Sequence, residues 1–124
     1  MKLIEQARQA RQTAFAPYSG YTVGAAVLGD NDKIYLGANV EVACSSVGVC
    51  AERIAIANCI MDGATPKHLA IIADCVNPIT PCGTCRQFML EFSPLLVTLA
   101  NLDGKHKLTT ANKLLPLKFE RRKL

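Results

Sequence analysis

LAIIADCVNPITPCGTCRQFMLEFSPLLVTL, residues 69–99, contains the pattern that decides the fold. It opens with an apolar run, residues 69–74, that is typical of a strand covered on both faces. A proline then precedes a segment of helical spacing, residues 82–92, which ends at a Ser-Pro pair. Residues 95–99 are predicted as another strand. A helix between two buried strands indicates a crossover, and therefore at least partly parallel pairing.

The residues on the N-terminal side extend this pattern. Residues 2–15 place apolar side chains along one stripe, which predicts an amphipathic helix. Residues 22–28 and 33–40 are predicted as strands on either side of a Gly-Asp-Asn-Asp turn, which makes a β-hairpin. The other predicted elements are a helix at 49–61, a weak strand around 107–108 and a helical turn at 111–115. The sequence therefore predicts an α/β fold with three α-β-α layers, in which helices cover both faces of a mixed, mostly five-stranded sheet.

Composition indicates one domain across residues 1–124. Half of the chain is hydrophobic and 19% is charged, so it has enough apolar side chains to form a core. No apolar run approaches the roughly 20 residues of a membrane span. The first residues also lack the continuous apolar segment of a signal peptide. We therefore expect a cytoplasmic protein that does not insert into membranes.

The net charge of +4 is concentrated near the C-terminus. Its basic side chains there are Lys118, Arg121, Arg122 and Lys123. A short basic tail can contact nucleic acid or an acidic partner. Phe119 is the one aromatic residue in this run, which lacks the repeated aromatic side chains of proteins that bind single strands. A solvated terminus is the favoured interpretation, and nucleic acid is not an expected partner.

Six cysteines, at positions 44, 50, 59, 75, 82 and 85, suggest metal binding rather than disulfides, because cytosolic thiols are kept reduced. Cys59 and Cys75 are predicted to be small buried hydrophobes. Cys50 and Cys82 each open a predicted helix, and Cys85 follows on the same helical face as Cys82. Helix N-termini favour thiolates. These three cysteines are thus predicted to hold one zinc ion.

Zinc with three protein ligands and one open position is a catalytic arrangement. Glu52 follows the first thiol by two residues and can move protons to and from water at that position. Arg53 is a candidate to withdraw electron density from a ligand sulfur by hydrogen bonding. Two alternatives are a redox C-x-x-C motif and a closed site with Cys44 as the fourth ligand. Neither explains Glu52 or the proline before Cys82.

Five stretches of this sequence resemble the cytidine deaminases, specifically the small homotetrameric class with an all-cysteine zinc site. They are PYSGYTVGAA (17–26), NVE (39–41), CAER (50–53), PCGTCRQ (81–87) and LLP (114–116) followed by Phe119. The resemblance implies a hydrolase that acts on the C–N bond of a cyclic amidine. It would convert cytidine and deoxycytidine to uridine and deoxyuridine with release of ammonia, as part of pyrimidine salvage.

The resemblance also implies a role for individual residues. Glu52 would take a proton from water, deliver it to N3 of the pyrimidine and assist the departure of ammonia. Asn39 and Glu41 would bind the ribose with their side chains. The Ala51 backbone would contact the base, and Tyr21 and Val23 would line the pyrimidine pocket. Phe119 of a neighbouring subunit would stack on the base. From the residues alone, a turn role for Asn39 and a core or interface role for the two aromatics are the alternatives.

Two positions differ from the pattern of the family. Ser45 stands in a segment that commonly carries a tyrosine close to a neighbouring site. Tyr21 replaces a phenylalanine and adds a hydroxyl group. The alternative functions are deamination of another cytosine nucleoside, of the blasticidin type, and a non-catalytic zinc-stabilised binding module. The presence of Asn39 and Glu41 favours a plain ribose.

Overall fold

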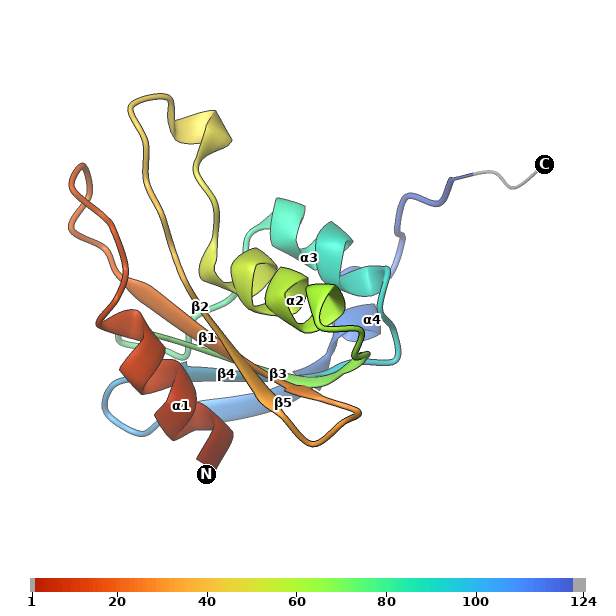
Figure 1. Ribbon diagram of the computed structural model, residues 1–124. Helices are drawn as coiled ribbons and strands as arrows, with labels where there is room; N and C mark the ends of the chain where they lie inside the picture. The colour runs from red at the N-terminus through yellow and green to blue at the C-terminus, as the bar shows by residue number, and fades with distance from the viewer. Residues whose placement is uncertain (1, 122–124) are drawn as a thin grey trace.

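The computed structural model describes residues 2–121 as one five-stranded sheet with helices on both faces (Figure 1). In sheet order, the strands are β2 (Ile34–Ala38), β1 (Val23–Gly29), β3 (Pro66–Ala73), β4 (Leu96–Asn101) and β5 (His106–Thr110). The helices are α1 (Lys2–Arg11), the 3-10 turn η1 (Ser45–Val47), α2 (Ala51–Met61), α3 (Gly83–Leu90) and α4 (Ala111–Leu114). Helix α1 covers one face, and α2 and α3 cover the other. The predicted three-layer α/β fold is confirmed.

The strand pairing is mixed, as the sequence predicts. Strand β1 pairs antiparallel with both β2 and β3, whereas β3 and β4 pair in parallel, with His68 opposite Leu96. Strand β5 returns antiparallel to β4. The parallel pair is the one joined by α3, so residues 69–99 do form the strand-helix-strand crossover. This crossover places the N-terminus of α3 beyond the C-terminal end of β3.

The core lies on both faces of the sheet, because side chains of the central strands alternate between them. Leu69, Ile71 and Val97 pack with Ile56 of α2 and Met89 of α3. On the opposite face, Ala26, Ala70 and Ile72 pack under α1. Every residue from Leu69 to Ala73 is buried, which explains why the sequence of β3 is apolar without alternation.

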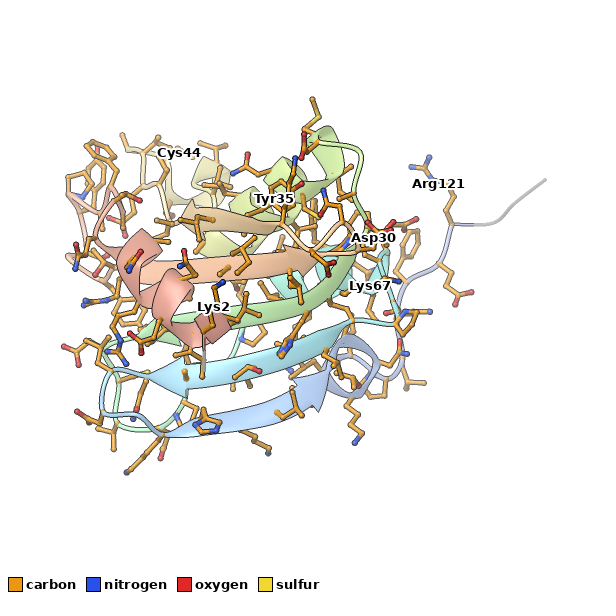
Figure 2. The ribbon with its side chains drawn as sticks, turned by 60° about the horizontal axis from the view of Figure 1, so that its bottom comes forward. Lys2, Asp30, Tyr35, Cys44, Lys67 and Arg121 are labelled. Atoms are coloured by element: carbon orange, nitrogen blue, oxygen red, sulfur yellow. The ribbon has the colours of Figure 1, made fainter. Side chains whose placement is uncertain are left out.

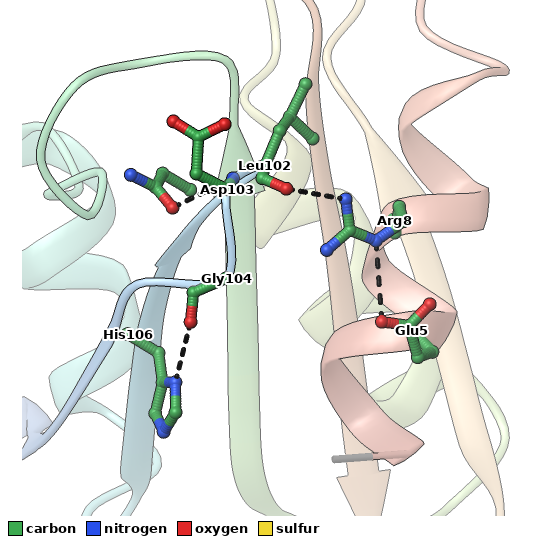
Figure 3. Close-up of polar contacts among 7 residues, drawn as sticks. Glu5, Arg8, Leu102, Asp103, Gly104 and His106 are labelled. Carbon is green, nitrogen blue, oxygen red and sulfur yellow. Dashed lines mark hydrogen bonds and ion pairs between the residues drawn. The ribbon is translucent and has the colours of Figure 1, made fainter.

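Helix α1 ends at Arg11, four residues earlier than the periodicity predicts. The backbone of Phe15 is used elsewhere: its N–H donates to Asn39 O at 2.9 Å, and its carbonyl accepts from Glu41 N at 2.8 Å. A segment that pairs with an extended chain cannot continue a helix. Arg8 fixes the helix itself by donating to Leu102 O at 3.2 Å and by pairing with Glu5 (Figure 3).

Cys59 is buried as predicted, but Cys75 is only half-buried. The difference arises because β3 ends at Ala73, and Cys75 already lies in the bend that leaves the sheet. All six cysteines are free thiols. Within residues 2–121, no helix has the length and apolarity needed to cross a membrane. Arg122 and Lys123 of the predicted basic tail lie outside the described residues.

Candidate metal and nucleoside site

Three thiols converge where α2 and α3 begin. Cys50 is the N-cap of α2 and Cys82 is the N-cap of α3, and neither side chain caps its own helix. Cys85 lies in the first turn of α3 and is buried. A cysteine at an N-cap leaves the peptide N–H groups of the first turn pointing toward its sulfur, which stabilises negative charge there. The helix starts therefore form an environment suited to thiolates.

The spacing of these sulfur atoms fits a single metal ion. The Sγ atoms of Cys50 and Cys82 are 3.8 Å apart, and all three Sγ atoms lie within 4.8 Å of one another. A tetrahedral zinc ion with Zn–S bonds of about 2.3 Å separates its sulfur ligands by about 3.8 Å. Among the described residues, these three cysteines form the one such group, and Cys44 is not part of it. The donor set therefore fits zinc and leaves the fourth position open.

The three thiols differ in how readily they lose a proton. The hydrogen bond from Cys85 lowers the pKa of Cys50 to about 5, against the opposing effect of burial, with further help from Cys82 and Arg53. The same hydrogen bond to Cys50, together with burial, raises the pKa of Cys85. These neighbours therefore favour the thiolate form of Cys50. Metal binding requires the other protons to leave as well.

Arg53 lies beside the Cys50 thiol. Its Nη2 donates to Gly48 O at 3.1 Å, and its charge and hydrogen bonding help to lower the pKa of Cys50. Its Nε is buried and has no hydrogen-bond partner. A buried unpaired guanidinium N–H is costly, and a sulfur ligand carrying negative charge is a suitable acceptor. The orphaned donor agrees with a site whose ligands are thiolates.

Glu52 is the one carboxylic acid buried among these groups, with only 4% of its surface exposed. Burial is the main cause that raises its pKa, and the Cys50 charge adds to the effect. The neighbouring Cys85 thiol acts in the opposite direction and lowers the pKa of Glu52. A buried carboxyl group next to an open metal position can hold a proton or accept one.

Asn39 and Glu41 form an adjoining polar cluster at the loop that contains residues 17–22. Asn39 Nδ2 donates to Tyr21 O at 2.8 Å, and its Oδ1 accepts from Val23 N at 2.8 Å. The carboxylate of Glu41 accepts from the N–H groups of Tyr18 and Ser19 and from the Ser19 hydroxyl. These bonds lower the pKa of Glu41, chiefly through the Ser19 hydroxyl.

Both side chains therefore hold a loop, which is the turn role that was the alternative for Asn39. An amide can form up to four hydrogen bonds, so each end of Asn39 retains capacity for another partner. The sequence indicated neither this cluster nor the part of Ser19 in it, although the P-Y-S-G stretch contains the residues. Beside the loop lies a cavity of about 330 Å³, lined by Tyr18, Ser19, Glu41, Val42, Ala43, Ser45 and Gly48.

The remaining predicted substrate residues are distributed more widely. Val23 and Ala51 are buried at the start of β1 and of α2. The Tyr21 side chain is partly exposed, and burial together with Cys75 raises its pKa. The ring of Phe119 is 74% exposed on the C-terminal segment, beyond α4. Figure 1 shows this segment leaving the molecule away from the loops that contain residues 17–22 and 40–48.

Sequence reasoning also missed Arg86 and Gln87, although both lie in the quoted PCGTCRQ stretch. Arg86 Nε donates to Pro81 O and Nη1 donates to Leu114 O, each at 2.9 Å. Gln87 bonds to the backbone of Phe119. An arginine followed by a glutamine just after two metal ligands was the available signal, but a sequence does not show which carbonyl groups such side chains reach.

The fold and the three-thiol group define a zinc-binding α/β protein with a buried carboxyl group at an open metal position. Residues 1–100 match the family described as the cytidine and deoxycytidylate deaminase zinc-binding region. The chain is 43% identical to a cytidine deaminase of Sporosarcina psychrophila, over 99% of this chain and 93% of the relative. It is 27% identical to a blasticidin-S deaminase of Bacillus cereus, over 98% and 92%.

Among solved structures, the cytidine deaminase of Burkholderia pseudomallei superposes with a TM-score of 0.92. That protein is 41% identical, and the match covers 95% of this chain and 97% of the other. The chain belongs to the cytidine and deoxycytidylate deaminase family.

Proposed function

We propose that this protein is a zinc-dependent hydrolase that converts cytidine and deoxycytidine to uridine and deoxyuridine. The observation that carries this proposal is the buried carboxyl group of Glu52 beside three thiols whose spacing fits one zinc ion. Membership of the family and the names of its relatives support the substrate class. In the reaction a C4–O bond forms from water, the C4–N4 bond breaks, and ammonia leaves.

Zinc bound at this site supplies a Lewis acid that lowers the pKa of water. Cys50, Cys82 and Cys85 would hold it and leave one position open. Glu52 would accept a proton from water, donate it to N3 of the cytosine ring, and carry a second proton to the departing N4. Its burial supports this role, because a carboxyl group kept from bulk solvent exchanges its proton with the reacting atoms.

Arg53 would moderate the charge of the site. Three thiolates on Zn²⁺ give a net negative group, which weakens the ion as a Lewis acid. A guanidinium that donates to a sulfur draws charge away from it. The unpaired buried Nε of Arg53 supports this role. The N-terminal dipoles of α2 and α3 would act in the same direction.

The ribose would bind at the free hydrogen-bonding positions of Asn39 and Glu41. A carboxylate accepts from hydroxyl groups, and an amide both donates and accepts. Tyr21 and Val23 would line the pyrimidine pocket, and the Ala51 backbone would contact the base. The adjacent cavity of about 330 Å³ between the loops, lined in part by Glu41, supports a ligand of nucleoside size here.

The assembly we propose is a homotetramer with shared sites, in which Phe119 stacks on the base bound to a neighbouring subunit. The large exposed fraction of Phe119 supports this assembly, because an aromatic side chain on a projecting segment buries little apolar surface in a monomer. Phe15, Tyr18 and Val47 on the loops are exposed as well. Light scattering of the purified protein tests the assembly, and a monomeric mass would contradict it.

We further propose that residues 1–124 act as a single cytidine deaminase-like domain in the cytoplasm, within pyrimidine salvage. The six free thiols support a reducing compartment.

The zinc-loaded protein, incubated with cytidine, tests the function directly. Ultraviolet absorption should show conversion to uridine, and the same should hold for deoxycytidine. Absence of turnover by protein that carries one zinc per chain would contradict the enzyme and favour a zinc-stabilised binding module. Preference for blasticidin S over cytidine would favour the second candidate function, deamination of a blasticidin-type nucleoside. One relative is named a blasticidin-S deaminase, which is why this function is tested.

A further inference from the structure

The side chain of Gln87 holds the backbone of Phe119 from both sides. Its Nε2 donates to Phe119 O at 3.0 Å, and Phe119 N donates to its Oε1 at 3.2 Å. A primary carboxamide presents a donor and an acceptor on the same side, as the N–H and C=O of one residue in an extended strand do. It can therefore pair with one residue of an extended chain as a neighbouring strand would. The paired residue is the one whose ring projects into solvent.

The residue before Gln87 holds the start of the same segment. Arg86 donates to Leu114 O at the end of α4 and to Pro81 O just before α3. Two consecutive side chains of α3 thus attach the C-terminal segment at both ends, Arg86 at residue 114 and Gln87 at residue 119. Because Cys82 and Cys85 lie on this helix, the position of Phe119 is set relative to the metal site.

Between these attachments, Leu115 is partly buried against the core, whereas residues 116–121 are exposed. Leu117 and Phe119 are largely exposed, and a cavity of about 720 Å³ lies where the segment passes Gln87, Leu90 and Ser93. The ion pair at Lys118 is with Glu120 of the same segment, so it does not tie the segment to the body. The two hydrogen bonds of the Gln87 carboxamide are therefore what ties the backbone of residue 119 to α3.

The C-terminal segment also lies on the opposite side of the molecule from the loops that would bind the nucleoside in the same chain. Figure 2 shows Arg121 and Cys44 at opposite ends of the structure, and Figure 1 places the loop with residues 40–48 at the end away from the C-terminus. A ring held at residue 119 is thus presented outward, to a second molecule. Its location relative to α3 then decides where it enters that neighbour.

We infer that Gln87 is a positioning residue for nucleoside binding, which fixes the backbone of Phe119 so that its ring reaches the base in the neighbouring subunit's site. This rests on the proposed function, in which Phe119 stacks on the base. Gln87 does not touch substrate, and it acts only through Phe119. The role of Gln87 therefore depends on an intact aromatic ring at position 119.

Steady-state kinetics of the zinc-loaded protein test this dependence. Gln87→Leu removes both hydrogen bonds and should raise KM for cytidine by about tenfold with little change in kcat, given the ordinary net strength of two such bonds. Gln87→Glu keeps the acceptor but places a carboxylate against the Phe119 carbonyl. Its KM should therefore lie between those of the unmodified protein and Gln87→Leu. Glu91→Gln, which lines the same cavity, is the control and should leave KM unchanged.

A double-mutant cycle with Phe119→Ala separates positioning from a structural role. Gln87→Leu should add nothing to the KM of Phe119→Ala. An equal rise in both backgrounds would overturn the inference, and so would an unchanged KM in Gln87→Leu where Phe119→Ala raises it. If Phe119→Ala itself leaves KM unchanged, the stacking in the proposed function is what fails, and Gln87 loses its positioning role with it.

Fluorescence gives a readout that does not depend on turnover. The chain has no tryptophan, so Phe119→Trp introduces a single reporter. Binding of uridine should change its emission in the zinc-loaded protein. Adding Gln87→Leu should weaken that change and shift it to higher uridine concentration. A titration that is identical with and without Gln87 would overturn the inference.

Discussion

Cys50 and Cys82 occupy equivalent positions in two different helices, and their sulfur atoms lie 3.8 Å apart. Each is an N-cap whose side chain is released from capping and is directed to the other helix start. The first turn of each helix then contributes one further group, Glu52 in α2 and Cys85 in α3. The metal ligands and the carboxyl group are thus placed by the starts of two helices packed on one sheet.

Replacement of Cys82 should remove the metal. In Cys82→Ser, zinc measured by elemental analysis should fall well below one ion per chain, because a hydroxyl group is a much poorer zinc ligand than a thiolate. Added zinc should raise the midpoint of thermal unfolding of the unmodified protein but not of this variant, since binding to the folded state stabilises it. Cys44→Ser is the matched control and should retain its zinc. Equal zinc content in both variants would contradict the assigned ligands.

Glu52→Gln should keep zinc and lose nearly all turnover. The amide has a similar shape but cannot move a proton, and loss of a general acid-base group typically lowers kcat by about 100- to 10,000-fold. Glu5→Gln, on the surface of α1, should leave kcat unchanged. A Glu52→Gln protein with full zinc and a substantial residual rate would remove Glu52 from the proton transfer.

Arg53→Ala should lower turnover or zinc affinity by about 10- to 100-fold, the usual effect of removing a group that supports a metal ligand. Arg53→Lys keeps the charge but loses the fixed geometry of the guanidinium. Its turnover and zinc affinity should therefore lie between those of the unmodified protein and Arg53→Ala. The measurements are kcat at saturating zinc and zinc competition with a chelator. Full turnover and unchanged affinity in Arg53→Ala would exclude the proposed role.

The sequence carried the order of elements and the three ligands, because both depend on local patterns. An apolar run, a turn and a cysteine before a helix can each be recognised within a few residues of sequence. The helix boundary at Arg11 was missed because its cause is non-local, the pairing of Phe15 with residues 39 and 41. The hydrogen bonds by which Asn39 and Glu41 hold the loop at residues 18–23, and the attachment of Phe119 to Gln87, join segments that are distant in the sequence, and a local pattern does not show them.

Gly37 shows how closely the sheet approaches the metal-binding helix. A Cβ atom at this position would lie 2.3 Å from Ala51 O and 2.5 Å from Ala55 N, both in the backbone of α2. Gly37→Ala should therefore push α2 away from β2 and lower the free energy of unfolding by about 1–3 kcal/mol. Zinc affinity should fall as well, since Cys50 begins that helix. Urea unfolding at saturating zinc and chelator competition measure the two effects, and an unchanged unfolding midpoint would contradict this packing.

His68 makes stability depend on pH. Its Nε2 shares a hydrogen bond of 2.7 Å with Thr98 Oγ1 on the neighbouring strand, and desolvation by burial lowers its pKa. The folded state then binds a proton less readily than the unfolded chain, in which histidine titrates near about pH 6.5. The contribution of His68 is therefore complete above that pH and is lost progressively as the pH falls toward the lower folded pKa.

Urea unfolding between about pH 7.5 and pH 5.5 measures this slope, because the carboxyl groups of the unfolded chain titrate mainly below that window. His68→Gln retains a polar side chain opposite Thr98 but cannot take up the proton, so its stability should vary less with pH. His106→Gln is the matched control, since the residue at position 106 is exposed on the edge strand β5, where its Nδ1 is hydrogen-bonded to Gly104 O. It should keep the slope of the unmodified protein. If both variants show the same pH dependence as the unmodified protein, His68 is not the group responsible, and its partial burial beside Thr98 does not disfavour its charged form.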